Sequence, residues 1–99
     1  MEVTIPFLGV FEDAMLKGYK IQTARTKRYG RLGDTFTAFG QKFVITRVFQ
    51  YFLSTVAKYN YRIEGLDSPE QFQEIWKRLH PRKGYRPDDK VWVHVFKRT

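Results

Sequence analysis

The stretch Gly18-Tyr-Lys-Ile-Gln-Thr-Ala-Arg-Thr-Lys-Arg-Tyr-Gly-Arg-Leu-Gly-Asp34 organises this chain of 99 residues. It places the hydroxyl of Thr23 between two cations, Lys20 and Arg25, and no acidic residue interrupts it before Asp34. Like charges in one segment repel each other and lower stability unless an anion compensates them. We therefore interpret this segment as the floor of a site for a nucleic acid or a nucleoside, held in place by a small barrel.

The composition indicates an ordered domain without cysteine chemistry. With 42% hydrophobic and 17% aromatic residues, the chain has ample material for a core, which argues against disorder. The sequence contains no cysteine, so disulfide scaffolds, thiolate zinc sites and cysteine nucleophiles are excluded. We expect residues 1–99 to form one domain.

The net charge of +8, from 18 Lys and Arg against 10 Asp and Glu, favours polyanionic partners. An anionic membrane surface is the competing polyanion, but no long basic amphipathic helix is visible that would lie on one. The first residues lack the basic and apolar regions of a signal peptide, and no apolar run approaches the ~20 residues of a membrane span. We expect a cytoplasmic protein, with a monomer favoured and no membrane partner.

Short extended segments separated by turns dominate the secondary-structure prediction. Glycines and polar residues mark the turns, including a hairpin at Gly40-Gln41. The segments expected to be extended are Val3–Phe7, Ile21–Thr26, a strand beginning at Asp34, Lys42–Phe52 and Lys90–Lys97.

Two helices are expected, at Phe11–Lys17 and after Ser68. Gly18 suits the end of the first, because glycine adopts positive φ without strain. Ser68 is the predicted N-cap of the second helix, with Pro69 at its first position and a glutamine at the capping-box position. Its apolar stripe, spaced i, i+3, i+4 and i+7, comprises Phe72, Ile75, Trp76 and Leu79.

The segment Leu53–Tyr61 fits either a short helix or another strand. The elements together favour an α+β, mainly β fold. We expect a small, closed or nearly closed β-barrel with two short helices at its ends.

Thr23 is the only plausible nucleophile in the chain. A lysine held partly neutral by burial and by Arg25 would activate its hydroxyl. The alternative is a solvated basic loop in which Thr23 has no chemical role, and the spacing of Lys20, Thr23 and Arg25 alone favours that alternative.

Glu64 is the one acidic residue between Asp34 and Asp67. Facing the lysine, it would act as a general acid or base, or bind the exocyclic amine of a base. As a surface carboxylate it would pair with Arg62 or Lys58 and contribute well under ~1 kcal/mol. The sequence leaves both roles open.

The aromatic and histidine residues give weaker signals. Two lone histidines, His80 and His94, lack a ligand at metal-binding spacing, so we expect neither a metal nor a cofactor. Stacking on a base contributes roughly 1–3 kcal/mol for each aromatic ring. The candidate rings for such stacking are Tyr19, Tyr29, Tyr85 and Trp92.

The octapeptide Gly18-Tyr-Lys-Ile-Gln-Thr-Ala-Arg25 resembles the Gly-x-Lys-x-x-Thr-x-Arg signature of the ASCH domain, a PUA-like β-barrel family linked to RNA. The resemblance continues in order along nearly the whole chain. Leu32-Gly33-Asp34 is similar to the Gly-Asp turn of the family, Glu64-Gly65 to its acidic segment, and Val91–Phe96 to its closing strand.

The resemblance implies an activity, because bacterial members of the family are N4-acetylcytidine amidohydrolases with a catalytic lysine, threonine and glutamate. These fall on Lys20, Thr23 and Glu64, with Arg25 as a substrate-positioning residue. Other members are RNA-binding modules or ribonucleases, so a non-catalytic module and a ribonuclease stay as alternatives. The remaining residues expected to bind substrate or RNA are Tyr19, Lys27, Arg28, Arg31, Arg82, Lys83 and Arg86.

Two departures from the family pattern shift the expected substrate. This chain has Ile21-Gln22 where the enzymes carry threonines, and Thr26 where they carry an acid after the arginine. The basic run after Arg25 is also heavier than a free nucleoside requires. Both RNA and a modified nucleoside are therefore expected as partners, with the basic run favouring a polynucleotide.

Overall fold

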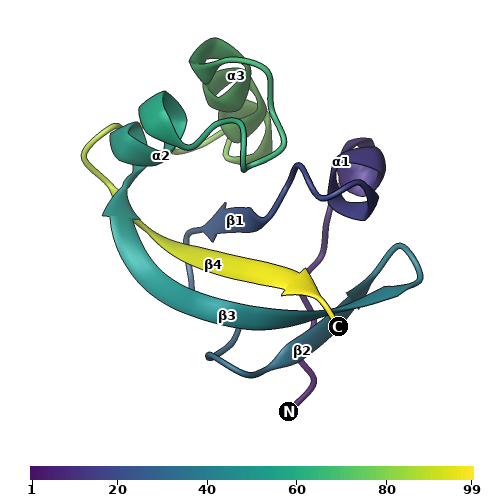
Figure 1. Ribbon diagram of the computed structural model, residues 1–99. Coiled ribbons are helices and arrows are strands. Elements are labelled where there is room, and N and C mark those ends of the chain that lie inside the picture. The colour runs from purple at the N-terminus through teal and green to yellow at the C-terminus, as the bar shows by residue number, and fades with distance from the viewer.

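Four antiparallel strands form one strongly curled sheet in the order β1-β4-β3-β2. Figure 1 shows that β1 and β2 lie at the two edges of the sheet and that β3 bends along its length. The computed structural model describes residues 1–99. The strands are β1 (Gln22–Arg25), β2 (Thr35–Ala38), β3 (Gln41–Phe52) and β4 (Lys90–Arg98).

The curl of the sheet has its origin in β3. A bulge between Ile45 and Arg47 shifts the register against β4, so that Ile45 faces Phe96 and Val48 faces His94. Bulges increase twist and bend the strand that carries them. Before the bulge, the side chains of odd-numbered residues of β3 face the inside of the sheet, and after it those of even-numbered residues do. The bend that the bulge produces curls the sheet into a half-barrel.

Three α-helices and one 3-10 turn complete the fold. Figure 1 shows α2 and α3 together at the end of the sheet where β3 finishes, and α1 beside β1. Their bounds are η1 (Gly9–Phe11), α1 (Glu12–Leu16), α2 (Leu53–Tyr59) and α3 (Pro69–Leu79).

The helix termini follow the sequence closely. The Ser68 side chain accepts a hydrogen bond from the Gln71 N–H at 3.0 Å, as the predicted N-cap requires. Gly18 has φ +84° and ends α1 as predicted. The undecided segment Leu53–Tyr61 contains α2, so the helices number three and not two.

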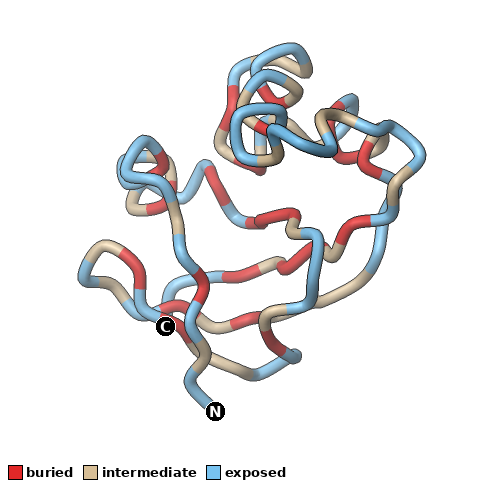
Figure 2. The backbone as a smooth tube through the Cα atoms, turned by 180° about the vertical axis from the view of Figure 1, so that it is seen from behind, coloured by how far each residue is buried: buried red, intermediate tan, exposed pale blue.

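The core occupies both faces of the sheet. On one face, Phe36, Phe43 and Phe96 form an aromatic cluster with ring centroids 5.3–5.4 Å apart. Toward the helices, residues such as Leu53, Val56 and Phe72 are buried against the strands. Figure 2 shows the buried segments along the strands and the inner sides of the helices.

Two sequence predictions are wrong in detail. The segment Val3–Phe7 forms no strand: an isolated bridge joins Glu2, just before it, to Thr35, and the Val3 N–H donates to Thr35 O at 2.7 Å. Pro6 lacks an N–H with which to continue that ladder. Leu79 was expected in the buried stripe of α3, but it is half exposed because it lies at the mouth of a pocket.

The predicted α+β barrel fold is confirmed, as a curled four-stranded half-barrel that stays open between β1 and β2, with strands and helices of nearly equal share. No helix of the chain combines the length and apolar character needed to cross a membrane.

Candidate active site

A pocket of about 330 Å³ opens beside β1. It lies where Figure 1 shows β1 running between α3 and the segment that carries α1. One wall is polar and consists of Lys20, Thr23, Arg25 and Glu64. The apolar lining comes from the N-terminal segment, from Leu66 and from α3, and consists of Pro6, Phe7, Leu8, Phe11, Leu66, Phe72, Ile75, Trp76 and Leu79.

The pairing of β1 decides which backbone groups face this pocket. The Phe96 N–H donates to Ile21 O, so in antiparallel alternation the backbone of Thr23 pairs with β4 and that of Ala24 faces the free edge. The Ala24 N–H donates to Glu64 Oε1 at 3.3 Å. The loop that carries Glu64 therefore lies along the free edge of β1.

Glu64 is almost fully buried, with 4% of its surface exposed. Besides the Ala24 N–H, it accepts a hydrogen bond at 2.9 Å from Gln22 Nε2 to Oε2. Burial raises the pKa of its carboxyl, and the nearby Lys20 together with these hydrogen bonds opposes that rise only in part. The surface pairing with Arg62 or Lys58 that the sequence left open is wrong.

Lys20 is as deeply buried, with 3% of its surface exposed. Its Nζ donates to Gln22 O at 2.9 Å and to Glu64 O at 2.7 Å, and it lies 3.8 Å from Glu64 Oε1. Burial lowers the pKa of Lys20 to about 8; the carboxylate of Glu64 opposes this shift and the charge of Arg25 adds to it. The lysine thus has a substantial neutral fraction near physiological pH.

Thr23 is buried, and its hydroxyl is held by Arg25. Arg25 Nε donates to Thr23 Oγ1 at 3.0 Å, and its Nη2 donates to Pro6 O at 2.6 Å. The guanidinium carbon lies 5.0 Å from the ring centre of Phe7 and 5.4 Å from that of Tyr29. No hydrogen bond joins Thr23 to Lys20, although both line the pocket. Thr23 therefore lies buried on β1 and not in a solvated basic loop.

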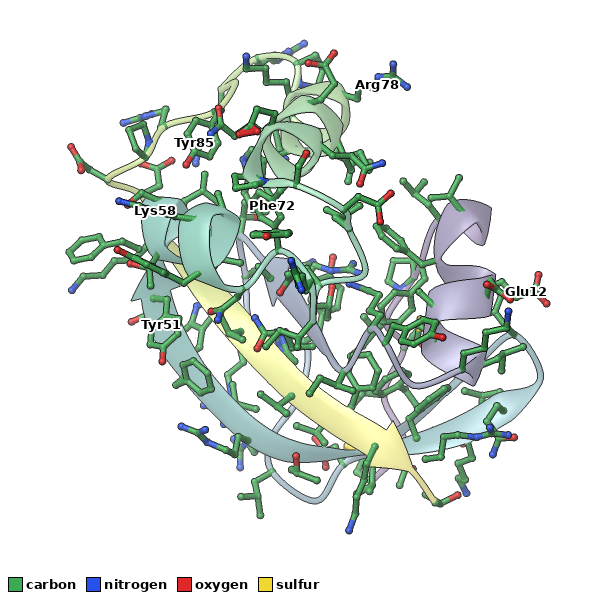
Figure 3. The ribbon with its side chains drawn as sticks, turned by 45° about the horizontal axis from the view of Figure 1, so that its top comes forward. Glu12, Tyr51, Lys58, Phe72, Arg78 and Tyr85 are labelled. Atoms are coloured by element: carbon green, nitrogen blue, oxygen red, sulfur yellow. The ribbon has the colours of Figure 1, made fainter.

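The other residues predicted from the sequence lie outside this pocket. Of the stacking candidates, only Tyr29 lines it. Figure 3 shows Phe72 directed from α3 toward the sheet and Tyr85 in the loop that follows α3. The exposed residues away from the pocket are Tyr19, Lys27, Arg28, Arg31, Arg82, Lys83 and Arg86.

Sequence reasoning missed two supports of the site. Gln22 donates a hydrogen bond to the Glu64 carboxylate. The only sequence pattern that could have indicated this role is the position of a polar glutamine inside a short strand. The ring of His80 stacks on Trp76 at 4.2 Å, and both residues line the pocket. No group of three or more His, Asp or Glu side chains lies close enough together to hold a metal ion.

Comparison with known proteins identifies the fold. No family model and no curated protein matches the sequence. Among solved structures, the ASCH domain from Lactobacillus crispatus JV V101 matches with a TM-score of 0.74 at 18% identity, over 90% of this chain and 70% of that one. The hypothetical protein PH0355 matches with a TM-score of 0.71 at 14% identity, over 94% of both chains.

Protein EF3133 from Enterococcus faecalis V583 matches with a TM-score of 0.64 at 19% identity, over 88% of this chain and 68% of that one. The chain therefore has an ASCH-like fold, and the predicted fold class is confirmed. At these identities the likeness extends to the fold alone.

Proposed function

We propose that this protein hydrolyses the acyl amide on N4 of an acylated cytosine, in a nucleoside or in RNA. The observation that carries the proposal is that a buried lysine with a pKa of about 8, a buried threonine and a buried glutamate all line one pocket. Perturbed titratable groups gathered in a cleft are typical of catalytic sites. The resemblance of the octapeptide to the ASCH signature supports the same residues.

The first step transfers the acyl group to the protein. Thr23 Oγ1 attacks the acyl carbonyl carbon while Lys20 accepts the hydroxyl proton as general base. Arg25 donates a hydrogen bond to Thr23 Oγ1 and orients this oxygen for the attack. As the bond from the acyl carbon to N4 breaks, protonated Glu64 gives its proton to N4, and cytosine leaves with its free amine.

The second step releases the acid. Water attacks the acyl-threonine ester, with the glutamate now ionised and able to accept the proton of the water. The ester bond breaks, the carboxylic acid leaves, and Thr23 regains its proton from the ammonium of Lys20. The apolar wall carried by α3 excludes bulk water and packs against the ring of the base.

Release of cytidine from N4-acetylcytidine by the purified protein tests the proposal. We expect turnover by the wild type and a loss of at least about 100-fold in kcat for Thr23→Ala, Lys20→Met and Glu64→Gln. Thr23→Ser keeps the nucleophile and retains activity. Thr46→Ala and Lys97→Ala change the same residue types away from the pocket and serve as controls with unchanged kcat. Equal turnover by wild type and Thr23→Ala removes Thr23 from the chemistry.

A second function is favoured by a separate observation, the many exposed cations outside the pocket, among them Lys27, Arg28, Arg31, Arg82, Lys83 and Arg86. In this function the protein is a non-catalytic RNA-binding module in which these cations bind phosphates. RNA affinity that falls steeply with salt, with no product from any acylated cytidine, favours it. Cleavage of labelled RNA that survives a chelator would instead point to a ribonuclease using Lys20 and Glu64.

A further inference from the structure

His94 is a fully buried titratable residue that the proposed chemistry does not use. Its side chain has 0% of its surface exposed, and it does not line the pocket. It lies on β4 directly opposite Thr23 on β1, and residues paired in this way point to the same face of a sheet. The histidine is therefore the immediate neighbour of the threonine on that face.

The hydrogen bonding of His94 sets its protonation state. Its Nε2 accepts a hydrogen bond of 3.0 Å from the Tyr29 N–H, so that nitrogen must carry a lone pair. A neutral ring then carries its proton on Nδ1, which has no partner within hydrogen-bond distance. A buried polar atom without a partner is unfavourable. An apolar side chain at position 94 would avoid that cost. The hydrogen bond to the Tyr29 N–H is therefore the contribution that only a polar side chain such as histidine can make there.

A chain of contacts links this bond to the proposed nucleophile. The His94 ring packs edge-on against the Tyr29 ring, with centroids 6.2 Å apart. The Tyr29 ring lies 5.4 Å from the guanidinium of Arg25, and Arg25 holds the Thr23 hydroxyl at 3.0 Å. We infer that His94 is a positioning residue, which fixes Tyr29 and, through it, the Arg25 donor on the Thr23 hydroxyl. This inference rests on the proposed function.

The charges around His94 agree with a neutral ring. Burial lowers its pKa, and the two charged groups that face it, Arg25 on β1 and Arg28 in the following loop, lower it further. The backbones of Thr23 and Trp92 oppose the shift, although neither forms a hydrogen bond of good geometry with Nδ1. On β3 its neighbour is the uncharged Val48. No carboxylate appears among the groups that raise the pKa.

Two substitutions separate positioning from packing. His94→Leu fills the space but cannot accept from Tyr29, whereas the side-chain oxygen of His94→Gln reaches the position of Nε2. We expect His94→Leu to lower kcat for N4-acetylcytidine between about 10- and 100-fold with little change in KM, and His94→Gln to recover most of that loss. Val48→Ala, which disturbs the packing opposite His94, is the control and keeps the wild-type kcat.

A double substitution tests the route of the effect. If His94 acts through Arg25, then His94→Leu lowers kcat no further in an Arg25→Met background. Tyr29 lies in a loop and is only partly buried, so Tyr29→Leu tests the same route even if the variants of buried residues do not fold. We expect it to lower kcat as His94→Leu does. Wild-type kcat in folded His94→Leu or in Tyr29→Leu, or a full additional loss in the double variant, overturns the inference.

Hydrogen exchange measured by NMR tests the positioning role of His94 independently of the proposed function. In ¹⁵N-labelled protein, the Arg25 Nε–H is expected to exchange slowly with water in the wild type and in His94→Gln. We expect it to exchange at least about tenfold faster in Thr23→Val and in His94→Leu. No turnover by the wild type, with this pattern intact, refutes the amidohydrolase proposal alone. Unchanged exchange in His94→Leu or in Tyr29→Leu refutes the positioning role, whatever the activity.

Discussion

Lys20, the proposed general base, illustrates how burial lowers the pKa of a side chain that is normally an ammonium at neutral pH. Below its pKa of about 8 it is mainly an ammonium and has no lone pair with which to accept the Thr23 proton. Because the mechanism also needs a protonated Glu64, we expect kcat/KM to depend on pH as a bell. It rises toward about pH 8 as Lys20 loses its proton, and it falls at the pH where the Glu64 carboxyl ionises. A pH profile of the wild type between about pH 6 and 10 measures this.

Lys20→Arg is the matched variant, since a guanidinium stays protonated across this range. It is expected to lose activity at every pH. A wild-type profile that is flat between about pH 6 and 8 would assign the base to another group.

Gly65 determines how closely the backbone approaches that lysine. It has φ +94°, and a Cβ built there would lie 3.0 Å from Lys20 Cβ and 3.3 Å from Phe11 Cδ1. Gly65→Ala therefore adds a steric clash in the site to the strain of positive φ. We expect a loss of about 2–3 kcal/mol in the free energy of unfolding, measured by urea denaturation, and reduced turnover.

Gly84→Ala isolates the steric part of this effect. Gly84 also has positive φ, at +66°, but a Cβ there would meet no atom within 4 Å. Its loss of stability is expected to be about 1 kcal/mol, from strain alone, with normal turnover. Equal losses in the two variants would mean that Lys20 is not held by close packing against Gly65.

At the scale of elements, α3 supplies much of the apolar wall and depends on its N-cap. The Ser68 side chain accepts the Gln71 N–H, and Gln71 Oε1 accepts the N–H of Asp67 at 2.7 Å. Ser68→Ala is expected to lower the free energy of unfolding by about 1 kcal/mol, measured by urea denaturation. Ser54→Ala, inside α2 and without a side-chain hydrogen bond, should change it by less than about 0.5 kcal/mol. A Ser68→Ala variant as stable as the wild type would show that packing alone fixes the start of α3.

The elements differ in how far their own sequence predicts them. The start of α3 and the end of α1 are predictable because a cap or a terminal glycine acts within a few residues. The helix α2 is undecided by its sequence, since its β-branched and aromatic residues also suit a strand. The structure forms a helix there and buries Leu53, Val56 and Ala57 against the core.

The residues of the candidate site likewise divide into those that local sequence predicts and those that depend on distant contacts. The octapeptide identifies the lysine, the threonine and the arginine, because they are local in sequence. Burial of Glu64 depends on a distant loop folding along β1, and no local pattern encodes that contact. The hydrogen bond from Tyr29 to His94 joins residues 65 positions apart, so the positioning role that we infer for the histidine could be argued only from the three-dimensional structure.

At the scale of the whole molecule, the net charge of +8 is poorly compensated. Among the 18 Lys and Arg residues, only Lys17, Lys20 and Arg86 lie within 4.0 Å of a carboxylate. The molecule measures 32 × 24 × 23 Å along its principal axes. The Debye length is ~30 Å at 0.01 M salt and ~8 Å at 0.15 M. At low salt the cations therefore repel one another across the entire protein, and at physiological salt only near neighbours do.

This repulsion lowers the stability of the compact state, so added salt should raise the melting temperature. We expect a rise of several degrees between about 0.01 and 0.15 M NaCl, which corresponds to about 1 kcal/mol for a domain of this size. Differential scanning calorimetry measures it. The double variant Lys83→Glu with Arg86→Glu lowers the net charge from +8 to about +4 and should show a smaller rise. A melting temperature that is independent of salt in both proteins would mean that the exposed cations are too far apart to interact. The exposed cations would then have no electrostatic cost for a bound polyanion to relieve.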